Sequence, residues 1–145
     1  STYRNLRRNP EALTKSHVVV VRMDANLYFA NASAFKDLVL EADVKSPALQ
    51  TIVIDMYPVN RIDSTGVEAL EEVIETCRRH GVTVLLAGVK GPVRDVLDDA
   101  GVSNDLGVDN FFLEVHAAVQ RAEAIAEESA DDAEAEARER AASTA

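Results

Sequence analysis

The sequence predicts an α/β fold with a single mixed β-sheet of about five strands and about four helices, followed by a flexible acidic C-terminal tail. Short β-branched runs alternate along the chain with segments of helical spacing, which is the pattern of strands joined by crossover helices. Apolar residues make up 47% of the 145 residues, enough to build the core of one domain. After residue 126 no large apolar residue occurs, so that part offers no face to bury.

The pattern of residues 17–43 predicts a β-hairpin followed by a helix. The valine-rich segment 17–23 and the segment 27–29 are separated by the turn-like residues 24–26, so they indicate two short antiparallel strands. Residues 31–43 then place apolar side chains at helical spacing. The sheet is therefore expected to start with an antiparallel pair.

The rest of the domain alternates strand and helix. Residues 51–56 form a β-branched run without polar alternation, which is typical of a strand covered on both faces. The elements that follow are a helix from 67 to about 81, a strand at 82–88, a helix from Pro92 to Gly101, a short strand at 111–113 and a helical face over 115–126. This order predicts parallel strands with right-handed crossovers.

Charge and composition exclude several classes of function. The net charge of −10 argues against nucleic-acid binding, which needs a basic footprint. The charge is uneven: residues 1–22 carry five basic side chains and one acidic one, whereas residues 123–145 carry eight acidic and two basic ones. The simplest interpretation of each end is a solvated segment.

No membrane span, leader or metal centre is predicted. The longest apolar runs, such as Val18–Val21, are far shorter than the roughly 18 to 20 residues of a transmembrane helix, and no signal-peptide pattern opens the chain. The single cysteine, Cys77, excludes an internal disulfide and favours a reducing compartment, the cytoplasm. No spacing of His, Cys or paired acids resembles a ligand set.

The stretch "NRIDSTGVEALEEV" (60–73) raises the question of a nucleophilic Ser64. Such a serine needs a base within hydrogen-bonding reach, and the candidates are His17, His80 and His116. No glycine stands two residues before the serine, as the nucleophile elbow would require. The sequence therefore predicts that the protein is not an enzyme.

The same stretch has the features of a helix start. Thr65 followed by Glu68 predicts a capping box, with Asp63 and Ser64 as alternative caps. This geometry also places a hydroxyl at the carboxyl edge of the sheet, where ligands of open α/β sheets bind and where a helix N-terminus favours a phosphoryl group. A cap and an anion or modification site can coexist here.

Three segments resemble a known family. "IVIDMYPVNRIDSTGVEALEEV" resembles the strand, loop and helix of the STAS domain, the fold shared by sulfate permease-type (SulP) anion transporters and by bacterial anti-sigma factor antagonists. "LYFANASAFKDLV" (27–39) and "TYRNLRRNPEA" (2–12) are similar to segments of the transporter branch, and the soluble antagonists lack both. The resemblance covers about residues 2–126.

What the resemblance implies is the cytoplasmic C-terminal regulatory or interaction domain of a secondary anion transporter of the inner membrane, for sulfate, bicarbonate or a related small anion. The chain then divides into a basic lead-in from a membrane part (1–16), a STAS domain (17–126) and an acidic, Ala- and Glu-rich disordered tail (127–145). The alternative is a free-standing anti-sigma factor antagonist, in which a partner kinase phosphorylates the serine at the position of Ser64.

The resemblance also implies partners and ligands. The partners are the transmembrane part of the same transporter, cytosolic regulatory proteins, the membrane surface through the basic N-terminal segment, and a second copy in a homodimer. No cofactor is required. Weak nucleotide binding would place a phosphate near Asp63, Ser64, Thr65 and Gly66 and the loop with Gly88 and Lys90, although no Walker-type lysine motif is present.

Overall fold

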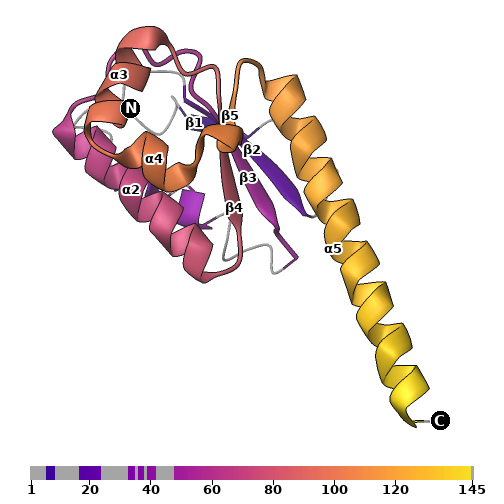
Figure 1. The fold of residues 1–145 in the computed structure, drawn as a ribbon. Helices are drawn as coiled ribbons and strands as arrows, with labels where there is room; N and C mark the ends of the chain where they lie inside the picture. The colour runs from indigo at the N-terminus through magenta and orange to yellow at the C-terminus, as the bar shows by residue number, and fades with distance from the viewer. Residues whose placement is uncertain are drawn as a thin grey trace.

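The computed structural model describes residues 6–8, 17–23, 33–34, 36–37, 39–41 and 48–144, with the backbone alone at 6–8 and 23. These residues form one five-stranded sheet in the order β1-β2-β3-β4-β5 (Figure 1). The strands are β1 Leu6–Arg8, β2 Val18–Met23, β3 Thr51–Asp55, β4 Thr83–Ala87 and β5 Phe111–Phe112. β1 is antiparallel to β2, and all other neighbours are parallel. The predicted mixed sheet of an α/β fold is confirmed.

The antiparallel partner of β2 differs from the one that the sequence predicts. It is β1, Leu6–Arg8, which the sequence analysis assigned to the lead-in 1–16. These three residues include two arginines, so they form neither an apolar run nor an alternation of apolar and polar residues. The sequence therefore gives no indication of a strand here. The predicted strand 27–29 lies outside the described residues.

The helices follow the predicted order, with one addition. They are α2 Ser64–Arg79, α3 Gly91–Asp99, α4 Val102–Leu106 and α5 Val115–Thr144, with a 3-10 turn, η3, at Val108–Asn110. Of the predicted helix 31–43, residues 33–34, 36–37 and 39–41 are described, and they are helical. The added helix is α4, which follows α3 directly because Gly101 turns the chain at a φ of 82°.

The sheet separates two layers of helices (Figure 1). On one face, Ile52 and Ile54 of β3 pack in a core cluster with the apolar stripe of α2 and residues of α3 and α4. On the other face, Val53 packs in a second cluster with Ala118 and Ala122 of α5. Both faces of β3 are therefore buried, as the unbroken apolar run predicts.

The C-terminal segment, for which the sequence predicts a disordered tail, is helical in the structure. Residues 127–144 continue α5 as helix, and every one of them is exposed. Alanine and glutamate have high helix propensity, and pairs such as Arg138–Glu134, at 2.8 Å, add local support. The expectation that the segment carries no buried face agrees with this exposure, and its mobility in solution stays a prediction.

None of the helices in the described part of the chain combines the length and the apolar character that a bilayer crossing requires.

Candidate functional site

The candidate site begins in the loop that leads from β3 to α2. The Asp55 carboxylate accepts a hydrogen bond from the Tyr57 N–H at 3.0 Å, and the Val59 N–H donates to the Met56 carbonyl at 2.9 Å. The side chains of Met56, Val59 and Ile62 are buried. The conformation of the loop is therefore stabilised by its buried apolar side chains and by the hydrogen bonds within it.

Asp63 caps α2. Its Oδ1 accepts a hydrogen bond from the Gly66 N–H at 2.8 Å, and Ser64 is the first helical residue. The predicted capping box of Thr65 and Glu68 is therefore wrong. The helix starts at Ser64, so Thr65 lies within the first turn and is not the N-cap residue. The alternative cap at Asp63, which the sequence left open, is the one used.

Because Asp63 is the N-cap residue, the Ser64 hydroxyl is not needed to cap α2. Ser64 is exposed, Thr65 is half-buried and Gly66 is buried. Of the four motif residues, Asp63 and Gly66 hold the helix start together, whereas Ser64 faces solvent. An added phosphate at Ser64 would lie at the positive end of the helix dipole.

Gly88 brings the loop after β4 against the loop after β3. Its φ is +71°, and a Cβ at this position would lie 3.0 Å from the Tyr57 Cβ. Its N–H donates to the Phe112 carbonyl at 2.9 Å. Only glycine meets both the backbone conformation and the close approach.

Lys90, in the loop after β4, contacts the loop that precedes the motif. Its Nζ lies 2.5 Å from the Asn60 Oδ1 and 4.9 Å from the centre of the Tyr57 ring. Lys90 also occupies the N-cap position of α3 without a side-chain cap bond. The structure thus places Gly88 and Lys90 at the same edge as Asp63–Gly66 and joins the two groups through Tyr57 and Asn60.

The sequence analysis did not single out Tyr57 and Asn60. They follow directly after a buried strand, and polar loop residues at that place are a usual sign of a ligand edge. Lys90 follows Asn60 by 30 residues, however, and only the parallel pairing of β3 with β4 brings the two loops together.

A groove of about 590 Å³ lies beside the motif, with Ser33 and Lys36 on one side and the first turns of α2 on the other. Thr65 and Glu68 line it on the α2 side. Across the groove, Lys36 Nζ pairs with Glu72 Oε2 at 2.7 Å. The hydrogen bond to Glu72 raises the pKa of Lys36 above its ordinary value, and the Glu72 charge adds to the shift.

The histidines are not gathered around Ser64. His17 directly precedes β2 and His80 ends α2, so both lie at the amino edge of the sheet, opposite the motif. His116 lies in the first turn of α5, on the other face. Among the described residues, no group of three His, Cys, Asp or Glu side chains could hold a metal ion.

Comparison with known proteins identifies the family of this arrangement. A family model described as "STAS domain" matches residues 9–118. "Probable sulfate transporter 4.2" of Arabidopsis thaliana is 37% identical over 130 residues, which cover 83% of this chain and 19% of that protein. "Sulfate transporter 4.1, chloroplastic" of the same plant is 32% identical with the same coverage of both chains. The chain thus spans about a fifth of the length of these relatives.

Solved structures agree with the sequence relatives. A sulfate transporter family protein from Wolinella succinogenes matches with a TM-score of 0.69 and 27% identity, covering 76% of this chain and 88% of that one. The murine Slc26a9 anion transporter in the inward-facing state gives the same score and identity over 80% of this chain and 20% of its own. A putative anti-sigma factor antagonist from Thermotoga maritima reaches a TM-score of 0.68 at 15% identity, covering 84% of this chain and 97% of that one, a likeness of fold alone.

Proposed function

The chain belongs to the STAS domain family, and we propose that it works as the cytoplasmic C-terminal regulatory and interaction domain of a secondary anion transporter of the sulfate permease type. The observation that carries the proposal is the similarity to sulfate transporters over 83% of the chain. The anion is sulfate or a related small anion. The antagonist branch has less support, because its similarity is confined to the fold.

The course of β1 supports a contact between the motif edge and a preceding transmembrane part. Leu6 pairs with Met23, the last residue of β2, because β1 runs antiparallel. Leu6, the first residue of β1, therefore lies at the carboxyl edge of the sheet, the edge that carries Ser64 and Lys90. A membrane part joined through this segment would meet the motif first.

Ser64 is the residue that we assign to regulation. It is exposed, and Asp63 performs the capping, so a change at Ser64 leaves the helix start intact. A phosphate there would gain from the helix dipole and would alter the charge that the membrane part meets. The catalytic role that the sequence analysis set aside is not part of the proposal.

Ligands and further partners complete the proposal. A nucleotide or anion would bind weakly between Asp63–Gly66 and the loop of Gly88 and Lys90. Pro92 removes one N–H from the first turn of α3, and Lys90 is already engaged with Asn60, so tight phosphate binding is not expected. The anionic membrane surface, through the basic N-terminal segment, cytosolic regulators and a second copy are the other proposed partners.

The coding sequence that surrounds the chain gives the first test. Several hydrophobic spans upstream of Ser1 are expected, and a stop codon there would overturn the transporter assignment. The second test is sulfate uptake by the full-length protein. Ser64→Asp should change uptake at least threefold while the melting temperature stays constant. Ser143→Asp, at an exposed serine of α5, is the matched control and should leave uptake unchanged; equal uptake in both variants would remove Ser64 from regulation.

A further inference from the structure

Two large apolar side chains are exposed at the carboxyl edge of the sheet. Leu113, which directly follows β5, is 93% exposed, and Tyr57, in the loop after β3, is 65% exposed. A single exposed apolar residue is common on soluble domains, so this pair is informative only if its members lie on one surface. The contacts between the loops show that they do.

Gly88 joins the loops that carry the two side chains. A Cβ at Gly88 would lie 3.0 Å from the Tyr57 Cβ, and the Gly88 N–H donates to the Phe112 carbonyl at 2.9 Å. Leu113 follows Phe112 directly, so Tyr57 and Leu113 lie on either side of the loop after β4. Neighbouring strands are about 4.8 Å apart, which separates the outer two loops by about 10 Å.

Lys90, in the middle loop, adds a positive charge to this surface. Its Nζ donates to the Asn60 Oδ1 at 2.5 Å and lies 4.9 Å from the centre of the Tyr57 ring. Both of these partners are neutral groups, so neither of them cancels the charge of Lys90. The carboxylates of Asp55 and Asp63, at the same edge, each accept a backbone N–H of their own loop.

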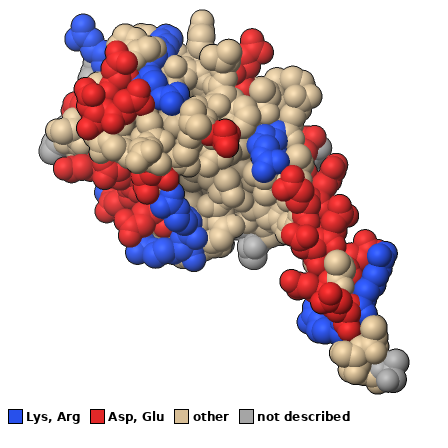
Figure 2. All heavy atoms as spheres, viewed as in Figure 1, with Lys and Arg blue, Asp and Glu red and all other residues tan. Residues whose placement is uncertain are grey.

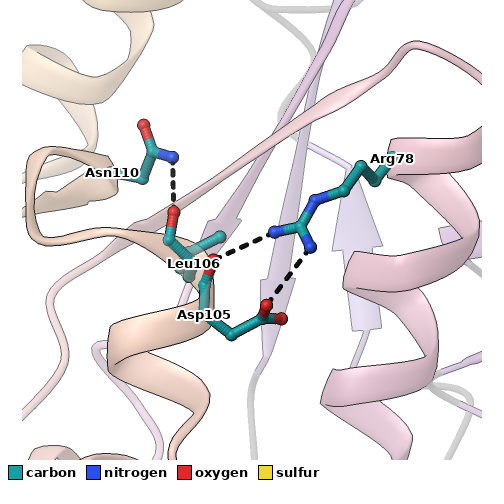
Figure 3. Close-up of polar contacts among 4 residues, drawn as sticks. All are labelled: Arg78, Asp105, Leu106 and Asn110. Carbon is teal, nitrogen blue, oxygen red and sulfur yellow. Dashed lines mark hydrogen bonds and ion pairs between the residues drawn. The ribbon is translucent and has the colours of Figure 1, made fainter.

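The opposite side of the sheet exposes an apolar side chain without such a cation. Val108, in η3, is 71% exposed. The cation on that side is Arg78, which donates to the Asp105 Oδ1 at 3.3 Å and to the Asp105 carbonyl at 3.0 Å, while Asn110 Nδ2 donates to the Leu106 carbonyl at 2.8 Å (Figure 3). A carboxylate therefore already accompanies this guanidinium.

The surface charge is distributed unevenly. Figure 2 shows acidic side chains along the exposed half of α5, whereas the surface between α3 and the start of α5, where β4 and β5 end, is mainly uncharged. In a chain with a net charge of −10, most acidic faces would be repelled by a negatively charged surface. The edge with Lys90, Tyr57 and Leu113 combines low charge with exposed apolar groups.

We propose that this carboxyl edge lies on an anionic lipid surface. Leu113 enters the headgroup region, the Tyr57 ring lies at the boundary where aromatic side chains with a polar end are favoured, and the Lys90 ammonium meets a lipid phosphate. Leu6, the first residue of β1, lies at the same edge. The proposal assigns residues of the domain itself to the membrane contact, and it rests on the proposed function for the origin of that membrane.

The arrangement favours a lipid surface over a peptide. Three separate loops supply one side chain each, and a bilayer can receive such side chains without a groove. The cavity of about 310 Å³ beside Val84 and the groove of about 590 Å³ beside α2 are lined by other residues. One leucine and one tyrosine give weak binding, which suffices for a domain that its own chain holds near a membrane.

Sedimentation with lipid vesicles measures the contact. The 145-residue chain should bind vesicles of equal parts phosphatidylcholine and phosphatidylglycerol, and Leu113→Asp should weaken this binding about tenfold. Val108→Asp is the matched control at the other exposed apolar residue and should weaken binding less than about twofold. The basic N-terminal segment is unchanged in both variants, so their difference reports on the carboxyl edge. Both substitutions are at exposed positions, and the melting temperature should stay constant.

Charge variants test the role of Lys90. Lys90→Glu should weaken binding about tenfold, whereas Arg79→Glu, at the exposed end of α2, should weaken it less than about twofold. Glu114, exposed beside Leu113, opposes an anionic surface, so Glu114→Gln should strengthen binding about twofold or more.

Equal effects within either pair of variants, weaker binding by Glu114→Gln, or equal binding to pure phosphatidylcholine vesicles would each overturn the proposal. So would the absence of binding at millimolar lipid. A stop codon upstream of Ser1 would overturn the transporter assignment and leave these measurements on the isolated chain valid, so the two failures are distinguishable.

Discussion

Two helices cover opposite faces of the same sheet, yet they differ in how much of each the fold uses. α2 has 16 residues and buries seven of them, whereas α5 has 30 residues and buries Ala118 and Ala122. The longer helix thus contributes less to the core. Burial of side chains, and not helix length, decides which of the two the domain depends on.

The side chains explain the difference. The buried stripe of α2 contains Leu70, Val73 and Ile74, which fill the space above the sheet. The fully buried residues of α5 are alanines, which allow the helix to approach closely but remove little apolar area from water, and Val115 and Val119 beside them are only partly buried. Beyond residue 127 the helix rests on propensity and on pairs between its own charges.

Shortening a core side chain of α2 should have the largest effect. Leu70 is fully buried, so Leu70→Ala should lower the free energy of unfolding by about 2 to 5 kcal/mol through lost burial and the cavity that remains. Urea unfolding followed by circular dichroism measures the change. Glu71→Ala, at the exposed neighbour, is the control; similar losses in both variants would show that the burial of Leu70 does not carry the contribution of α2.

Enlarging the small contact of α5 should have an intermediate effect. Ala118 is fully buried against the sheet, so Ala118→Leu should overpack the interface and cost about 1 to 3 kcal/mol. The adjacent Ala117→Leu, at an exposed position, should stay within about 0.5 kcal/mol of the parent. If Ala118→Leu is neutral in the same unfolding experiment, α5 does not pack closely on the sheet.

Removing the cap of α2 should cost less again. Asp63→Ala deletes the acceptor of the Gly66 N–H and should destabilise the domain by about 1 kcal/mol. Ser64→Ala should cost no more than a few tenths of a kcal/mol, since Ser64 does not occupy the cap position. The two melting curves separate the structural from the regulatory residue of the motif, and a larger loss from Ser64→Ala would reverse these roles.

The sequence predicted the fold through its strongest patterns. The run at 51–56 and the periodic stripe at 67–77 gave the central strand and α2 because both are long and apolar. It missed β1 and α4 because a three-residue strand and a five-residue helix are too short for a repeating pattern of apolar residues to be recognised. Pairing with β2, and the turn at Gly101, determine them instead.

The candidate site was predicted less completely. The sequence located Asp63–Gly66 at a helix start and Gly88 and Lys90 in the next loop, and the structure places both groups at the carboxyl edge. It did not decide among the three caps, because the choice depends on which residue begins the helix. The contact of Lys90 with Asn60 and the cavity beside Val84 arise from strand order and register, which local patterns do not contain.

Deleting residues 128–145 should have the smallest effect on stability. The removed segment is exposed along the described length of its helix, and its hydrogen bond to the domain, from Gln50 Nε2 to Ser129 Oγ at 3.3 Å, is itself exposed. Such a bond contributes at most about 0.5 to 1 kcal/mol, so the melting temperature should fall by no more than a few degrees. The helical signal at 222 nm should fall much more steeply.

The change in melting temperature, compared with the change in the signal at 222 nm, distinguishes the part of α5 that packs on the sheet from the exposed part beyond residue 127. A segment held by propensity loses its own helix and leaves the unfolding transition of the domain unchanged, because no side chain of the core loses a neighbour. Gln50→Ala in the full chain is the matched control, since it removes the hydrogen bond from Gln50 to Ser129 while keeping the helix. If deletion lowered the melting temperature by ten degrees while Gln50→Ala did not, the tail would pack on the domain through contacts other than that hydrogen bond, and α5 would resemble α2 along its whole length.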